Sequence, residues 1–286
     1  MIDLRKASKA AEQAAYAAGT HLLASRSRLA AVVITQKQPG DVASEIDREA
    51  EALIRDVVLK HFPDHSFSGE EGGCTGHNGG PQWVVDPLDG TANYLRGYPQ
   101  YAVSIALVEE GEPVLGVVFD PCRNEFFGAI RGRGAVVNGN TIRCAAPRAT
   151  ITAMAATVFP KPISPLMPQY VGELSRVLSS FGSVRRSGSM ALEMAYLAAG
   201  RIDAFWEHDM GAWDAATGIA LLRESGAVIH ARDGRSLLES GSLMASTPAL
   251  LADFAALLGP QERPLERSLE RPQEHHLSRS SDIPSR

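Results

Sequence analysis

"WVVDPLDGTANYLRGYP", residues 83–99, carries an apolar run directly into Asp86 and Asp89, which flank a Pro-Leu pair. Asp-Gly between apolar runs most often forms a hairpin turn, and in that interpretation Asp86 merely caps the end of a strand. Two further acidic motifs favour a larger role, because "SGEEGG" upstream carries Glu70 and "GAWDAATG" downstream places Asp214 at a predicted helix start. Acids at strand ends and helix starts can meet at one edge of a layered sheet, so we expect these four to converge.

Four carboxylates gathered in one pocket would repel one another strongly. At roughly 4 Å, a pair costs about 4 kcal/mol at an effective dielectric constant of about 20. Without compensation the groups would take up protons or push their loops apart. A bound cation is the usual compensation, and oxygen-only ligands without His or Cys select a hard ion over zinc. The spacing of a calcium-binding hand is absent, so the acids predict a Mg²⁺ site.

The residues after the second aspartate suit a phosphate group. Gly90 lets the backbone approach an anion closely, and Thr91 begins a predicted helix, "TANYLRG". A helix start offers free N–H groups and the positive end of a dipole. Pro87 stiffens the backbone, so that both aspartates can face one site and the carbonyl of Leu88 can turn toward a metal. Carboxylates for metal followed by amides for phosphate indicate phosphoryl transfer to water.

Composition limits the remaining function classes. The 286 residues are 44% hydrophobic and 21% charged, as in ordinary globular proteins, and the net charge of -5 gives no reason to expect direct nucleic-acid binding. No apolar run approaches the roughly 18 residues that span a membrane. The N-terminal "MIDLRKASKAAEQAAYAAG" predicts an amphipathic helix rather than a secretory signal. Three cysteines without metal-ligand spacing predict reduced thiols in a cytoplasmic protein.

Helix and strand patterns divide the chain into two halves and a tail. Residues 1–148 are predicted to form an α+β half that carries the metal and phosphate motifs, with a helix N-capped by Ser44 and an antiparallel meander across 82–130. In the same half, the glycine-rich "RGRGAVVNGN" (131–140) predicts turns. Residues 149–259 are predicted to form an α/β half that carries the substrate-binding residues. Residues 260–286 are charged and nearly free of apolar side chains, so we expect a disordered tail.

Three segments together resemble the signature motifs of a known family. "GEE", "WVVDPLDGTANYLRGYP" and "WDAATGIALLRESGAVI", in that order, are similar to those of the inositol monophosphatase family, over residues 1 to about 258. "RRSGSMALEMAYLAAGRIDAFWE" looks most like the bacterial inositol-1-monophosphatases. The resemblance implies a layered αβαβα sandwich, α+β or α/β in class, as in fructose-1,6-bisphosphatase.

The resemblance also implies a set of metal ligands. Glu70, Asp86 and the carbonyl of Leu88 would hold a first Mg²⁺. A second would be held by Asp86, Asp89 and Asp214. A third, weaker ion would touch Glu70 through water, and Mn²⁺ could substitute for Mg²⁺.

Catalytic and substrate-binding roles are carried over in the same way. The implied catalytic residues are Glu70, Thr91 and Asp47, with Thr91 and Asp47 orienting or deprotonating the attacking water. Phosphate and substrate hydroxyls would be bound by a larger set: Asp89, Gly90, Thr91, Gly188, Ser189, Met190, Glu207 and Asp214. Members of the family usually form homodimers and are inhibited by lithium, so both properties are expected here.

The implied reaction is hydrolysis of a small phosphomonoester, first of all myo-inositol-1-phosphate to myo-inositol and phosphate. Fructose-1,6-bisphosphatase or histidinol-phosphatase activity could use the same site and stays open. 3'(2'),5'-Bisphosphate nucleotidases often have Lys-Glu after Gly-Thr, where this chain has Ala-Asn-Tyr, so they are disfavoured. Some bacterial relatives contact the transcription machinery, so a regulatory role is the alternative from another class.

Several polar residues outside these motifs are predicted to have structural or surface roles. His208 and Asp209 are expected in a solvated loop, and Asp203 on an exposed strand or turn. Arg185 and Arg186 are expected at a surface or interface rather than on a phosphate.

Overall fold

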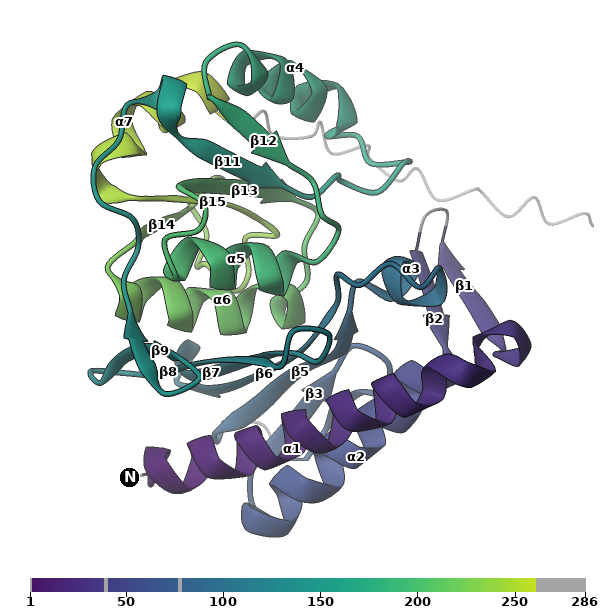
Figure 1. Cartoon of the computed structure of the whole chain (residues 1–286). Coiled ribbons are helices and arrows are strands. Elements are labelled where there is room, and N and C mark those ends of the chain that lie inside the picture. The colour runs from purple at the N-terminus through teal and green to yellow at the C-terminus, as the bar shows by residue number, and fades with distance from the viewer. Residues whose placement is uncertain (1, 39–40, 77–78, 261–286) are drawn as a thin grey trace, which may run out of the picture.

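The computed structural model describes residues 2–38, 41–76 and 79–260. The predicted tail therefore lies outside the described residues, apart from Pro260. Helices and sheets stack in five alternating layers (Figure 1), which confirms the αβαβα sandwich. None of the described helices is both long and apolar enough to cross a bilayer.

The first layer consists of two long helices, α1 (Leu4–Ser25) and α2 (Glu45–His61). Asp3 caps α1 by accepting hydrogen bonds from two backbone N–H groups of the first turn. Alanines fill the buried face of α1, and their small side chains let the helix lie close to the sheet. The approach is tightest at Gly19, where an added Cβ would lie 2.5 Å from the Phe119 ring.

The second layer is an eight-stranded sheet. Its strands in spatial order are β10 (Asn140–Ile142), β9 (Gly134–Val137), β8 (Glu125–Ile130), β7 (Glu112–Asp120), β6 (Ala102–Glu109), β5 (Gln82–Asp89), β3 (Ser66–Gly69) and β4 (Gly73–Thr75). All neighbours are antiparallel except β3 and β5, which confirms the predicted meander. The turns predicted over 131–140 are present at 131–133 and 138–139, where glycines take the positive φ values that hairpins need, but the prediction missed strand β9 between them.

The third layer, α5 (Met190–Ala198) and α6 (Ala212–Ser225), is enclosed between the two sheets. Both helices are therefore apolar on nearly every face. Gly116 of β7 allows α6 to approach the sheet, because a Cβ there would lie 2.8 Å from the carbonyl oxygen of Thr217.

The fourth and fifth layers are a five-stranded sheet and the two helices outside it. The strand order is β12 (Ser183–Arg185), β11 (Met154–Thr157), β13 (Ala204–His208), β15 (Ser242–Ser246) and β14 (Val228–Ala231). Helices α4 (Met167–Leu178) and α7 (Leu251–Leu258) cover its outer face. Strands β12 and β15 were not predicted, because short Ser-containing segments carry little apolar alternation.

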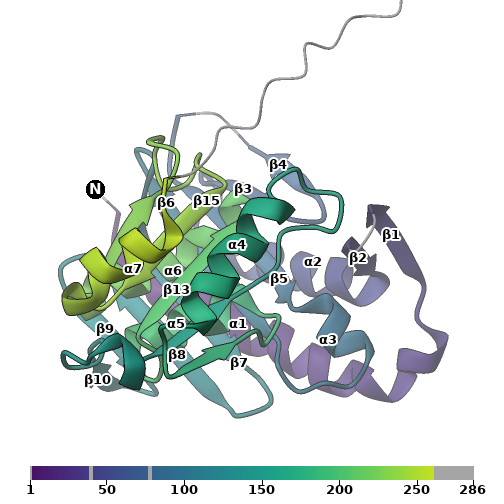
Figure 2. The ribbon, with the colours of Figure 1, turned by 90° about the horizontal axis from the view of Figure 1, so that it is seen from above.

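A small hairpin stands apart from the layers. Strands β1 (Ile34–Gln38) and β2 (Asp41–Ser44) pair with each other and lie beside α3 (Thr91–Leu95), as Figure 2 shows from above. Three 3₁₀ turns complete the described elements: Arg26–Ala31, Thr150–Thr152 and Pro248–Leu250.

Candidate active site

A β-bulge in β5 brings Asp86 and Asp89 to the same side of the sheet. Asp86 pairs with Ser104 of β6 and Asp89 with Ala102, so three steps along β5 match two along β6. In a regular strand, residues three apart point to opposite faces, and the one extra residue reverses that. The backbone N–H of Leu88 donates to Asp86 Oδ1 at 2.9 Å and fixes the turn. Both aspartates line the same pocket.

The chain leaves the strand through Gly90 and enters α3. Gly90 has φ 96°, and a Cβ there would lie 3.0 Å from the Gln100 carbonyl oxygen, so both backbone and space require glycine. The hydrogen bonds of the turn begin with the N–H of Asn93, which donates to the Gly90 oxygen at 2.9 Å. The N–H groups of Thr91 and Ala92 precede it and are those a helix start offers to a cap or ligand. The hairpin-turn interpretation of Asp89-Gly90 is therefore wrong, and the predicted helix start is confirmed.

Asp47 lies directly behind Thr91. The Thr91 hydroxyl can donate to Asp47 Oδ1 at 2.9 Å or to the Leu88 carbonyl oxygen at 3.0 Å, and its single proton serves one at a time. Asp47 Oδ2 accepts the Ser44 N–H at 2.9 Å and also its hydroxyl, which confirms Ser44 as the cap of α2. Asp47 is 1% exposed, and this burial raises the pKa of its carboxyl above the ordinary value.

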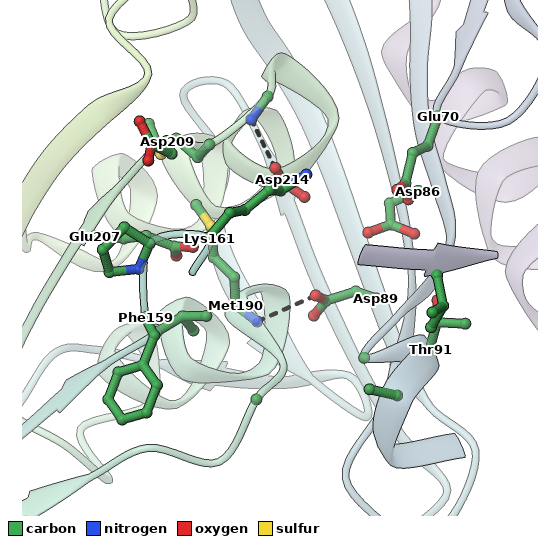
Figure 3. A pocket seen from close by; sticks show the side chains of 18 of the residues that line it. Glu70, Asp86, Asp89, Thr91, Phe159, Lys161, Met190, Glu207, Asp209 and Asp214 are labelled. Atoms are coloured by element: carbon green, nitrogen blue, oxygen red, sulfur yellow. Dashed lines mark hydrogen bonds between the residues drawn. The ribbon is translucent and has the colours of Figure 1, made fainter. Parts of the chain in front are cut away.

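Glu70 stands at the end of β3, where its N–H donates to the Val85 carbonyl oxygen at 3.1 Å. β3 is parallel to β5, so Glu70 and Asp86 follow neighbouring strand positions and lie close together (Figure 3). Lys37 of β1 reaches over them: its ammonium is 2.9 Å from Glu70 Oε1 and also pairs with Glu71. Sequence analysis missed Lys37, which is separated from Glu70 by more than thirty residues and carries no motif of its own.

The second half of the chain supplies the opposite wall. Asp214 begins α6, and its Oδ2 accepts the Gly211 N–H at 2.6 Å. Glu207 ends in the same pocket from β13 and is 7% exposed, and its Oε2 has no hydrogen-bond partner among the described residues. A buried carboxylate oxygen without a donor is costly, which makes Glu207 a site for a ligand hydroxyl.

The turn before α5 holds Asp89 in place. Asp89 Oδ2 accepts the Ala191 N–H at 2.8 Å and the Ser189 hydroxyl, and Oδ1 accepts the Met190 N–H at 3.2 Å. Gly188 has φ 85°, which favours glycine, and a Cβ at Gly90 would lie 3.2 Å from the Gly188 carbonyl oxygen. The turn from the second half thus orients an acid from the first half.

These residues enclose a cavity of about 860 Å³. Of the predicted site residues, all but two line it, and Figure 3 shows the acids pointing into it from both sides. The exceptions are Asp47, which acts through Thr91, and Ser189, which holds Asp89. Phe159, Lys161 and Arg186 form a further wall that sequence analysis did not place in the site.

The acids raise one another's pKa values. Burial raises the pKa of Asp214 to about 7 and that of Asp89 to about 6, and the charge of Glu70 adds to both shifts. Asp86 is raised well above its ordinary pKa by burial and by the charges of Glu70, Asp89 and Asp214. The pKa of Glu207 is also raised well above the ordinary value, by burial and then by the charges of Asp214 and Asp89. The pocket thus concentrates negative charge that Lys37, Lys161 and Arg186 on its walls offset only in part.

The donor set fits a hard divalent cation. Within the described ranges, no three His, Cys, Asp or Glu side chains are drawn closely enough together to form a complete ligand set. The available groups are nevertheless all oxygens, from Glu70, Asp86, Asp89, Asp214 and the carbonyl of Leu88. The raised pKa values of Asp86, Asp89 and Asp214 reflect burial and a repulsion that a cation would relieve. To bind such an ion, Glu70 would give up its ion pair with the Lys37 ammonium.

Comparison with known proteins agrees with this geometry. The model of the inositol monophosphatase family matches residues 3–262. The chain belongs to this family. It is 41% identical over 234 residues to the inositol-1-monophosphatase of Rhizobium meliloti, covering 81% of this chain and 88% of that one. It is 45% identical over 218 residues to the Nus factor SuhB of Xylella fastidiosa, covering 76% and 78%.

Solved structures of the family have the same fold. The crystal structure of the extragenic suppressor protein suhB from Bartonella henselae has a TM-score of 0.84 at 35% identity, covering 87% of this chain and 97% of that one. An IMPase from Thermotoga maritima has a TM-score of 0.78 at 30% identity, covering 86% and 94%. Membership of this family places the chain among the phosphomonoester hydrolases. Enzymes of the family generally use divalent metal ions.

Two predictions for residues near the site are wrong. His208 is 1% exposed rather than solvated: its ring nitrogens contact Glu173 Oε2 at 2.8 Å and Ser242 Oγ at 3.0 Å. Asp203 is also 1% exposed, and its Oδ2 accepts the Met154 N–H at 2.8 Å. The partners of both residues are distant in sequence, so the local sequence suggested exposure to solvent. Arg186 is exposed as expected, but it stands at the pocket rim, 4.5 Å from the centre of the Phe159 ring.

Proposed function

We propose that the chain hydrolyses a small polyol phosphomonoester, most directly myo-inositol-1-phosphate, with Mg²⁺ as the cation and Mn²⁺ as a possible substitute. The observation that carries the proposal is the set of buried acids whose charges raise one another's pKa values beside the start of α3. A phosphate dianion placed among them requires two or three divalent ions for the total charge to approach neutrality. Such ions would polarise the phosphate, acidify the attacking water and stabilise the leaving oxygen.

The chain's own residues have separate tasks in this scheme. Glu70, Asp86, Asp89, Asp214 and the carbonyl of Leu88 would hold the ions. Gly90 and Thr91 would bind the phosphate, because the N–H groups at the start of α3 face it without an intervening side chain. Met190 lines the pocket at the start of α5, beside Asp89 and across from Glu70 and Asp86.

Thr91 and Asp47 would receive the proton from the attacking water. The Thr91 hydroxyl donates its own proton to Asp47 Oδ1 at 2.9 Å and would accept a hydrogen bond from the water. Burial raises the pKa of Asp47, so this carboxyl takes up a proton more readily than an exposed aspartate. If the Leu88 carbonyl turns to a metal, it no longer competes for the Thr91 proton.

Glu207 would select the alcohol part of the substrate. Its unpaired Oε2 can accept a hydrogen bond from a ring hydroxyl, with Asp89 and the turn at 188–190 on the adjacent wall. A substrate that lacks this hydroxyl leaves the buried oxygen unsatisfied, and such a loss costs about 1–3 kcal/mol. Polyol phosphates are therefore expected to exceed simple alkyl phosphates in kcat/KM by roughly tenfold or more.

A substrate panel with free-phosphate detection tests the proposal. The panel would contain inositol-1-phosphate, histidinol phosphate, fructose-1,6-bisphosphate and glycerol phosphate, each with Mg²⁺ and with EDTA. We expect Mg²⁺-dependent release with inositol-1-phosphate as the best substrate. No release from any phosphomonoester at millimolar Mg²⁺ would contradict the proposed reaction. If fructose-1,6-bisphosphate is the preferred substrate, fructose-1,6-bisphosphatase activity replaces inositol-1-phosphate hydrolysis as the proposed function. One wall of the pocket favours this second candidate, because Lys161 and Arg186 could contact a second phosphate there.

A role in transcription is the candidate from another class, favoured by the similarity to proteins named Nus factor SuhB. If residues 260–286 bind the transcription machinery, the full-length protein should recover RNA polymerase from a bacterial lysate in a pull-down. A chain that ends at Gly259 should not recover it. The truncation leaves α7 and its contacts with Arg176 and Arg232 in place. If both chains recover the same amount of RNA polymerase, or if neither recovers any, residues 260–286 do not bind the transcription machinery.

A further inference from the structure

Glu51 is a buried acid that supports the loop carrying Glu70. It lies in α2, is 3% exposed, and reaches the backbone just beyond β3. Its Oε2 accepts the N–H of Glu71 at 2.8 Å, and its Oε1 accepts the N–H of Gly72 at 2.9 Å. Glu51 therefore contacts the backbone of the loop and leaves the Glu70 side chain free to face the pocket.

Glycines on both sides of the acidic pair make room for the Glu51 carboxylate. A Cβ at Gly69 would lie 2.2 Å from Glu51 Oε2, and one at Gly72 would lie 2.5 Å from Oε1. Neither glycine has the positive φ that would explain its presence by backbone conformation. Space for one carboxylate is thus the physical reason for both glycines, and the "GEEGG" segment is shaped around Glu51.

Only a carboxylate satisfies this loop completely. Two neighbouring N–H groups need two acceptors, and Asp or Glu alone offers two oxygens without a donor. Asp47 and Glu51 are four residues apart on one face of α2, and like charges at that spacing destabilise a helix. Each acid instead serves a different part of the pocket, since Asp47 holds Thr91 and Glu51 holds the loop of Glu70.

Lys37 and Glu51 hold the same loop in different ways. Lys37 pairs with the side chains of Glu70 and Glu71, so a cation that binds Glu70 must displace it. Glu51 binds backbone N–H groups, which do not change when the Glu70 side chain changes partner. An anchor of this kind also resists the repulsion that would move Glu70 away from Asp86.

We propose that Glu51 is a positioning residue for the metal site: it fixes residues 69–72 so that Glu70 stands beside Asp86 when the cation binds. This inference rests on the proposed function, because Glu70 is a metal ligand only there. It predicts that metal affinity, more than fold stability, depends on the Glu51 carboxylate.

The test measures the Mg²⁺-induced rise in melting temperature without substrate, and the Mg²⁺ concentration that gives half-maximal phosphate release. Glu51→Gln is the main variant, because it keeps shape but turns one acceptor into an NH₂ group. Glu45→Gln, the same change in the first turn of α2, is the matched control. Gly72→Ala disturbs the same contact from the loop, because its Cβ would collide with Glu51 Oε1. It replaces Glu51→Gln as the test variant if Glu51→Gln folds poorly.

We expect Glu51→Gln and Gly72→Ala to raise the half-maximal Mg²⁺ concentration by roughly 10–100-fold, the usual effect of losing a residue that orients a ligand. The Mg²⁺-induced rise in melting temperature should shrink at the same time, whereas Glu45→Gln should match wild type. If Mg²⁺ raises the melting temperature of wild type and of the variants equally, Glu51 has only a structural role. The inference about Glu51 then fails, while the proposed function stands. If wild type shows no Mg²⁺ response, both the metal role and this inference fail.

Discussion

Asp214→Asn is expected to lower phosphate release by on the order of 10³-fold and to raise the melting temperature of the metal-free chain. The loss of activity follows because an amide cannot supply the charge that holds a cation at the start of α6. The gain in stability follows because burial and the charge of Glu70 hold the pKa of Asp214 at about 7, so its ionised form is unfavourable in the fold. Asparagine carries no charge and can still accept the Gly211 N–H through Oδ1.

Asp209→Asn is the matched control for this experiment. Asp209 lines the same pocket, but it is exposed and has no assigned role. Its φ of 60° is one that asparagine adopts readily, so the change should not strain the backbone. Steady-state kinetics and thermal melts in EDTA would be run on both variants. An Asp214→Asn chain with near-normal turnover would remove Asp214 from the mechanism, and a lowered apo melting temperature would contradict the repulsion argument.

The acidic motifs were sufficient to predict that Glu70, Asp86, Asp89 and Asp214 line one pocket, but not the geometry that brings them together. Residues 83–99 indicated a strand, two converging aspartates and a helix start at Thr91, and the structure has all three. Their spacing alone would place Asp86 and Asp89 on opposite faces of a strand. The bulge that brings them together is defined by the register with β6, and register depends on a strand that sequence reasoning treats separately.

Residues satisfied by distant partners were the least predictable. His208 and Glu173 are 35 residues apart and meet only because α4 covers the sheet that contains β13. β15 has the segment "SLMAS", whose small and polar residues give no strand signal although every one is buried between β13 and β14. Glu51 likewise has no motif of its own in the sequence, because its two acceptors and the glycines around them become related only when α2 packs beside β3.

The metal-free chain is expected to lose stability as pH rises from about 4 to about 7, and Mg²⁺ is expected to restore it. The folded pKa values of Asp89 and Asp214, about 6 and about 7, lie above the ordinary value of 3.8. Between these limits the folded chain binds more protons than the unfolded chain, so stability must fall with rising pH. The two shifts together correspond to a loss of up to about 7 kcal/mol, or roughly 10–20 °C in melting temperature.

Other titrating groups do not reverse this sign. Asp86 and Glu207, whose pKa values are also raised, act in the same direction. Burial lowers the pKa of His65 below its ordinary value, which opposes the trend by at most a single proton. Carboxyls with lowered pKa values, such as Glu125 beside Arg201, change stability mainly below about pH 5.

Thermal melts of EDTA-treated protein between about pH 5 and about pH 8, with and without millimolar Mg²⁺, measure the effect. Protons and metal compete for the same oxygens, so the Mg²⁺-induced rise should be small at the acidic end and largest at the alkaline end. Saturation at about 100 times Kd would add about 2.7 kcal/mol. Asp214→Asn should flatten the metal-free profile, and Asp209→Asn should leave it unchanged. A metal-free melting temperature that rises steadily with pH would mean that the four acids do not share one buried pocket, because separated carboxylates have no raised pKa values to lose.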